Sequence, residues 1–348
     1  MKTRSSHTFG KWLVAGVLLA LPLTVQADQI KDFLKAFEKN GNYVQPFSTL
    51  FGTMTNSSWY QSAAVAKGFG FYVGIPISIT RVADADRSFA GTYIDKGCKD
   101  YHTTNPTGTQ KCTEVNHYTT PTLFGKKDAP LVWSYLTNST KDAIVDSIHP
   151  FLLSDGLSAF SSLNWIPFGM PQVSFSWWNT ELKLRYLGAP SIQGVSLQMP
   201  GIGIQHDLAS FLPRFVPNLP VNISVAGNIS WLSLDFAPPG AEYTGSMELN
   251  GFSHFLGIVV GYTHHGWVEA FMEAGWEGSS LESKGEVIVT KVGDPDETIR
   301  PNLNLEGRNT FRAALNVAVH FGYDAVFGQN VGSEFGQQIS VLSYRYKK

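Results

Sequence analysis

The sequence predicts an all-β protein, an antiparallel transmembrane β-barrel of about twelve strands with a short N-terminal helix and a long inserted segment. The main observation is a set of three segments, each about eleven residues long, in which apolar and polar side chains alternate. About nine to eleven residues is the length that a tilted strand needs to cross an outer membrane. The three segments are Phe69–Ile79, Val221–Trp231 and Phe311–Phe321, with apolar residues at the odd positions.

Composition and the absence of a helical span support the same class. Charged residues make up 16% of the 348 residues, below the roughly 25% of ordinary soluble domains, and aromatic residues make up 13%. A barrel with an uncharged outer band has this balance, and so does a large secreted β protein. After residue 27 no apolar stretch reaches the about 20 residues of a transmembrane helix. The net charge of −2 argues against a nucleic-acid partner.

Residues 1–27 have the pattern of a signal peptide. A basic N-terminus precedes an apolar run of about a dozen residues, which is too short for a membrane anchor. Val25–Ala27 then supplies the small residues of a cleavage site. We therefore expect an exported protein whose mature chain begins at Asp28.

Residues 28–66 are predicted to form an N-terminal helix and a plug segment. Apolar residues recur at helical spacing over 28–39, and Asn40-Gly41 supplies a stop signal. Residues 41–65 show mixed signals and no clear period.

The barrel is predicted to occupy residues 67–348, where weaker alternating segments lie between the three clear ones. The phase of the alternation changes between Trp177 and Leu182, which predicts a bulge or tight turn near Asn179. Five tryptophans lie in or beside strands, where either an interfacial girdle or core packing accounts for them. They are Trp177, Trp178, Trp231, Trp267 and Trp276.

Three carboxylates share one face if their segment is a strand, as the flanking glycines favour. They are Glu269, Glu273 and Glu277. Carboxylates facing lipid are costly, so we expect them to line the lumen and favour cations there. A solvated face beyond the membrane is the alternative.

A long loop and helical insertion is predicted at 95–171, a connection too long for a hairpin and therefore of functional interest. It contains a predicted helix around Lys141–Ile148. Cys98 and Cys112 are the chain's only cysteines, and an exported chain would let them form a disulfide around a loop of about 15 residues.

The motifs of catalysis are missing. The sequence has no G-x-S-x-G, no H-E-x-x-H and no phosphate-binding loop. We therefore expect no enzyme activity, no catalytic or metal-binding residues and no cofactor.

Several stretches, taken in order, resemble an uncharacterised family of bacterial outer-membrane β-barrel proteins, a domain of unknown function. The resemblance runs from about Gly41 to the C-terminus and implies a location and an architecture, with no activity attached. Its motifs are Asn42–Tyr60, Gly68–Thr80, Val82–Phe89, Pro121–Gly125, Met170–Leu187 and Gly201–Pro213.

Three functions follow as hypotheses. The first is an outer-membrane barrel of a Gram-negative bacterium that passes or binds a small hydrophobic molecule, with outer-membrane lipid and the barrel-insertion machinery as further partners. The second is a structural or adhesive outer-membrane barrel. The third is a soluble secreted β protein. Orientation separates the third from the others, because a membrane barrel turns Val225 outward and polar Ser224 toward the lumen, whereas a soluble protein does the reverse.

Overall fold

The computed structural model describes residues 41–91, 110–113, 118–126, 131–138, 144–152, 164–192, 194–208, 221–237, 243–265, 267–290, 296–320, 323–332 and 336–347. The signal peptide and the helix predicted over 28–39 lie outside these residues. The described residues form two compact units. The first takes those within Phe47–Arg81 and Asn164–Lys348, and the second those within Asn42–Pro46 and Val82–Leu163.

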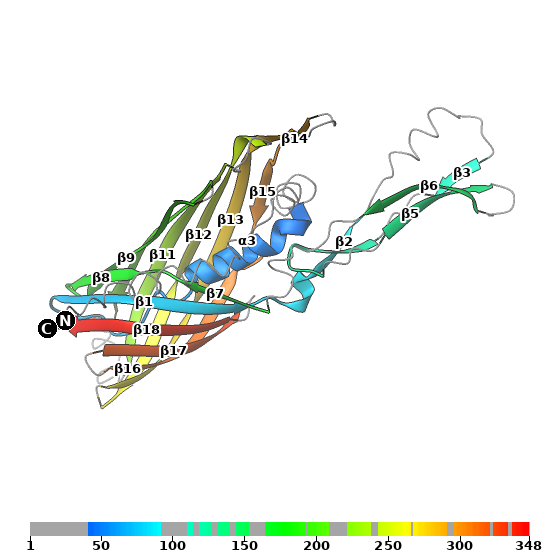
Figure 1. Ribbon diagram of the computed structural model, residues 1–348. Helices are drawn as coiled ribbons and strands as arrows, with labels where there is room; N and C mark the ends of the chain where they lie inside the picture. The colour runs from blue at the N-terminus through cyan, green and yellow to red at the C-terminus, as the bar shows by residue number, and fades with distance from the viewer. Residues whose placement is uncertain are drawn as a thin grey trace, which may run out of the picture. The chain divides into compact units, whose positions relative to one another are not determined.

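The first unit is an antiparallel β-barrel that closes on itself (Figure 1). Within the described residues, ten strands follow one another around the ring, and the pairing of β12 with β13 completes it. Closure removes the exposed edges that an open sheet would present. In ring order the strands are β1 (Gly70–Arg81), β8 (Gln172–Trp177), β9 (Thr180–Ile192), β10 (Val195–Asp207), β11 (Asn222–Phe236), β12 (Tyr243–His264), β13 (Val268–Val289), β16 (Phe311–His320), β17 (Tyr323–Gly332) and β18 (Gly336–Lys347).

Three short strands extend this sheet. They are β7 (Trp165–Gly169), which pairs with β1, and β14 (Glu297–Ile299) and β15 (Leu303–Glu306), which pair with β13. The described part of the sheet thus has 13 strands, compared with the about twelve expected. The predicted all-β antiparallel barrel is confirmed. No helix among the described residues is long and apolar enough to cross a membrane.

The barrel turns its apolar face outward. Along β11, Val225 and Trp231 are 37% and 41% exposed, whereas Ser224, Asn228 and Ser230, at alternate positions of the strand, are buried. β1 and β16 show the same alternation. This is the arrangement expected of a membrane barrel and the reverse of that in a soluble β protein.

A tight turn joins β8 to β9 where the sequence shows its change of phase. Trp178 and Asn179 both have positive φ, 46° and 59°. Two such residues twist a two-residue loop in the sense that matches the twist of the flanking strands. The turn predicted near Asn179 is confirmed.

Helix α3 (Gly41–Asn56) occupies residues in which the sequence shows no period. Its polar residues, including Ser48, Thr49, Thr53 and Asn56, are as buried as its apolar ones. From Ser48 to Asn56 every residue is buried. This part of the helix has no solvent face, so it lacks the periodic pattern from which helices are recognised. The helix predicted over 28–39, which the stop signal at Asn40-Gly41 was expected to end, lies outside the described residues and stays a prediction.

The second unit consists of short strands where a helical insertion was expected. β2 (Ser88–Gly91) pairs with β4 (Tyr118–Pro121), after the short helix η1 (Asp84–Asp86), and β3 (Gln110–Thr113), β5 (Leu131–Asn138) and β6 (Ile144–Leu152) form a three-stranded sheet.

Two expectations for the insertion are therefore wrong. The helix around Lys141–Ile148 is replaced over most of its length by β6, whose β-branched Ile144, Val145 and Ile148 favour a strand. The bounds 95–171 also shift, because the second unit extends from Val82 to Leu163 and β7 belongs to the barrel. Cys98 lies outside the described residues, so its disulfide with Cys112 stays a prediction.

Candidate functional site in the barrel lumen

The barrel is filled from within by residues 47–66, which we call the plug. It contains most of α3 and the ten residues that follow. The side chains of Trp59, Tyr60 and Ala63 are completely buried, and they pack on Phe255 and Phe271 of the barrel wall. The plug residues are thus the centre of the barrel's interior core.

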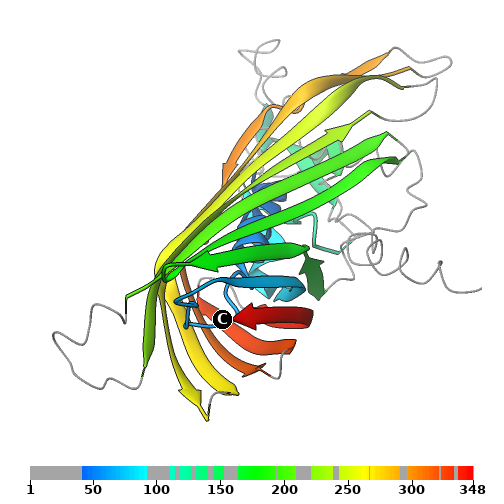
Figure 2. The ribbon, with the colours of Figure 1, turned by 90° about the vertical axis from the view of Figure 1, so that its left-hand side faces the viewer.

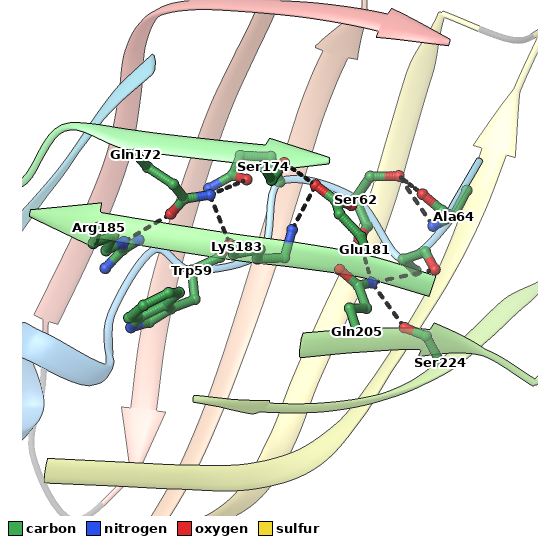
Figure 3. A network of polar contacts seen from close by, with 12 residues as sticks. Trp59, Ser62, Ala64, Gln172, Ser174, Glu181, Lys183, Arg185, Gln205 and Ser224 are labelled. Atoms are coloured by element: carbon green, nitrogen blue, oxygen red, sulfur yellow. Dashed lines mark hydrogen bonds and ion pairs between the residues drawn. The ribbon is translucent and has the colours of Figure 1, made fainter. Parts of the chain in front are cut away.

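Arg185 on β9 makes the most extensive contact between wall and plug (Figure 3). Its Nη1 donates to the carbonyl oxygen of Ser57 at 2.9 Å, and its Nη2 donates to that of Ser58. Its Nε donates to Gln172 at 2.7 Å, and its guanidinium lies over the Trp59 ring, 4.1 Å from the centroid. The planar fork suits this combination of paired acceptors and ring stacking.

Two glutamines on the wall bind the backbone of the plug (Figure 3). Gln172 Nε2 donates to the Trp59 carbonyl at 3.3 Å and to the Gln61 side chain at 3.2 Å. Gln205 Nε2 donates to the Ser62 carbonyl at 2.9 Å. Together with Arg185, these glutamines donate to backbone carbonyl groups that lie outside regular secondary structure. Buried carbonyl groups need such hydrogen-bond donors.

The first predicted lumen carboxylate, Glu269, holds the far end of the plug. It accepts hydrogen bonds from the Ala63 backbone N–H at 2.8 Å and from the Ser62 hydroxyl at 2.7 Å. Its Oε2 also lies 3.1 Å from His320 Nε2. A carboxylate with several donors is a strong anchor, because charge-assisted hydrogen bonds are about twice as strong as neutral ones.

Of the other two carboxylates, Glu273 is bound by side chains of the wall and Glu277 by the plug. Glu273 accepts from Asn316 Nδ2 at 3.1 Å, and its Oε2 lies 3.8 Å from Arg312 Nε. Glu277 accepts from Asn56 Nδ2 at 3.4 Å. All three glutamates therefore lie buried on the inward face of β13. Their predicted role as lumen carboxylates that favour cations stays a prediction.

A short polar chain links the helix end to the wall through Tyr60. The Tyr60 hydroxyl donates to Asn228 Oδ1 at 3.1 Å, and Asn228 Nδ2 donates to Asn56 Oδ1 at 3.1 Å. Burial raises the pKa of the Tyr60 hydroxyl well above its usual value, with a smaller contribution from the charge of Glu273. Tyr60 therefore stays protonated and keeps its role as donor.

Inward glycines on β10 provide the space for the Trp59 ring. A Cβ added to Gly203 would lie 2.8 Å from the indole, and one on Gly201 would lie 3.0 Å from it. Both distances are too short for van der Waals contact, so the two glycines are required by the plug.

We expect Gly203→Ala to destabilise the docked plug by about 1–3 kcal/mol, the usual cost of overpacking a filled core. Faster hydrogen exchange of the plug amides is the readout. Gly227→Ala is the matched control, because a Cβ there meets only the Phe255 carbonyl oxygen and the Leu256 side chain of the wall, at 3.3 and 3.5 Å, and no atom of the plug. Equal exchange in the two variants would show that Trp59 is not held by this contact.

The sequence identified one side of this site and missed the other. Glu269, Glu273 and Glu277 were recognisable because three carboxylates share a strand face. Arg185, Gln172 and Gln205 were not singled out, although each occupies a polar position in an alternating strand. Long polar side chains on the face opposite the apolar one were the available signal. Among the described residues, no group of His, Cys, Asp and Glu side chains could hold a metal ion.

The fold and this site define an antiparallel β-barrel with an apolar outer face and an internally plugged lumen. The chain belongs to a family of unknown function (DUF6588), which it matches over residues 7–335. Membership of a family without a known activity agrees with the resemblance noted in the sequence. No curated protein matches the chain.

Three solved structures to which the chain is similar are remote from it in sequence. The toluene transporter TodX of Pseudomonas putida is 8% identical, with 84% of this chain and 72% of that chain covered and a TM-score of 0.30. The translocator domain of the autotransporter NalP from Neisseria meningitidis is 11% identical, with 88% and 99% covered and a TM-score of 0.28. The toluene transporter TbuX of Ralstonia pickettii is 7% identical, with 81% and 90% covered and a TM-score of 0.21. The barrel assignment rests on the chain's own strand pairing.

Proposed function

We propose that this chain is an outer-membrane β-barrel protein of a Gram-negative bacterium, without enzyme activity, that passes or binds a small hydrophobic molecule through a lumen closed by the plug. The observation that carries the proposal is the closed antiparallel ring with its apolar residues outside. Only helices and closed barrels satisfy their backbone groups in hydrocarbon.

The extent of exposed apolar surface supports a lipid environment. Soluble monomers rarely expose contiguous apolar patches beyond a few hundred Å². The five tryptophans considered from the sequence are all exposed, so core packing does not account for them. Other large exposed side chains include Val73, Phe175, Leu184, Tyr186, Ile204, Leu256, Ile258, Met272, Leu315 and Val317, from seven strands of the ring.

Away from the polar contacts of the plug, the inner wall favours a hydrophobic rather than a hydrophilic passenger. Phe51 of the plug lies close to Leu232 and Leu281 of the wall, because atoms of all three side chains lie within 3.0 Å of the position that a Cβ on Gly251 would take. Further along the same inner face, β11–β14 carry an apolar cluster, whereas a water-filled pore has a polar lining. The cluster consists of Phe236, Met247, Val287, Val289 and Ile299.

A structural or adhesive role is the second candidate. The observation that favours it is the second unit, which has sheets of its own and is inserted between two strands of the barrel. Such a unit gives the protein additional surface for binding but provides no path for solutes.

Uptake by vesicles separates the two candidates. We expect vesicles with a lipopolysaccharide outer leaflet to admit a small hydrophobic fluorophore faster when they contain the protein, while a sugar of similar size stays outside. Entry of both solutes would indicate an open aqueous pore and contradict the proposed selectivity. Entry of neither, with a folded barrel in the membrane, would leave the structural or adhesive role.

A further inference from the structure

The polarity of the two faces of the sheet reverses partway along β11. As far as Trp231 the outward side chains are apolar, and inward neighbours such as Ser230 are polar. Beyond Trp231 the buried inward residues are Leu232 and Phe236, and the exposed outward one is Asp235. The far end of β11 therefore has the pattern of a strand in a soluble protein.

The reversal falls at paired positions on the neighbouring strands. Trp231 pairs with Phe252, the last large apolar residue on the outward face of β12 in this direction. Beyond it, Glu248 points outward and Met247 is buried inside. Glu248 pairs in turn with Lys284 on β13, also exposed. Three adjacent strands thus change polarity together.

On the outward face of these strands, charged side chains lie beyond this line. Lys284 Nζ lies 2.7 Å from Glu282 Oε1, and Arg300 Nε lies 2.9 Å from Glu286 Oε2. The exposed charged side chains of this region include Asp235, Glu248, Glu282, Lys284, Glu286, Arg300 and Glu306. On the other side of the line, the described outward residues of β10–β13 include no Asp, Glu, Lys or Arg.

The apolar part of the outward face has the height of a membrane. On β12 it runs from Phe252 to Tyr262, which is about 33 Å along the strand at about 3.3 Å per residue. A tilt of about 40° reduces this to about 25 Å, the height of the apolar band of outer-membrane barrels. Aromatic residues stand at both ends of the band, as they do at membrane interfaces.

We propose that the hydrocarbon of the outer membrane ends at the level of Trp231 and Phe252, and that the far ends of β11–β13, with β14 and β15, stand in water outside the cell. The inference rests on the proposed membrane location and adds the boundary. Figure 2 shows β11–β13 continuing beyond the neighbouring β16–β18 of the ring. At the same end as these far ends, β1 finishes at Arg81 and leads into the connection 82–164, and the longer connections face the outside of the cell in such barrels.

Single cysteines on the outward face test the boundary, in a background with Cys98 and Cys112 replaced by serine. Glu248→Cys and Lys284→Cys should react with a membrane-impermeant maleimide on intact cells about tenfold faster than Ile258→Cys and Met272→Cys, because a thiol must ionise in water to react. The first pair lies beyond the proposed line and the second pair within the band, on the same two strands.

Each other outcome has a distinct meaning. In one outcome, all four thiols are protected from the impermeant maleimide, while quenching by the lipid of dyes attached at positions 258 and 272 shows that these two positions face the membrane. This outcome would overturn the boundary and leave the membrane location intact. Reaction at 248 and 284 only after cell lysis would overturn the extracellular placement. Equal reaction of all four in detergent-free buffer, with the protein in solution, would overturn the proposed function itself.

Discussion

Replacing Arg185 with methionine is expected to release the plug while the barrel stays folded. The change removes the donors to the Ser57 and Ser58 carbonyls and to Gln172 but keeps an apolar stem against Trp59. Hydrogen bonds to charged groups contribute about 1.5–3 kcal/mol each, and they act here as one unit, so we expect the docking free energy to fall by about 3 kcal/mol. That corresponds to about a hundredfold more undocked plug.

Hydrogen exchange of the amides of residues 57–66 measures this effect, with strand amides as the internal reference. Arg185→Lys should recover little, because an ammonium cannot reproduce the planar fork. Leu184→Met is the matched control, since Leu184 lies next in the chain and faces outward. Unchanged exchange of the plug in Arg185→Met would contradict the anchoring role of Arg185.

The second large effect is expected from arginine on the outward face of β11. Val225→Arg should lower the free energy of unfolding by about 2–4 kcal/mol in lipid vesicles, because the guanidinium would face hydrocarbon. Asp235→Arg on the same strand and face should be nearly neutral, since Asp235 lies beyond the apolar band. Denaturant unfolding in vesicles compares the two, and equal losses of stability would contradict lipid contact at Val225.

We expect Ser224→Arg, on the inward face, to be destabilising. In a water-filled lumen the same substitution would be mild. Ser224 is fully buried and accepts a hydrogen bond from Gln205 Nε2 at 2.8 Å. The plug occupies the space that water would fill in an open lumen.

The strands were predictable because lipid imposes a simple rule on them. One face must be apolar, so every second residue is apolar throughout Phe69–Ile79 and Phe311–Phe321. The far ends of β11–β13 were less predictable from the sequence. There the rule reverses, and charged residues such as Glu248 replace apolar ones on the same face.

The plug could be predicted only in part. A segment before the first strand was expected to enter the barrel, but the helix over 41–56 was not recognised, because its residues from Ser48 to Asn56 are all buried. The partners of the plug lie far along the chain, as Ser62 with Glu269 illustrates. Only the folded ring brings them together.

Cell fractionation combined with a heat-modifiability gel tests the central claim most directly, namely that the apolar outer face meets lipid. The account predicts that the protein is recovered with the outer membrane, needs detergent for extraction and migrates differently when left unboiled, because the closed barrel survives the detergent. Recovery of folded protein from the soluble fraction without detergent would contradict it.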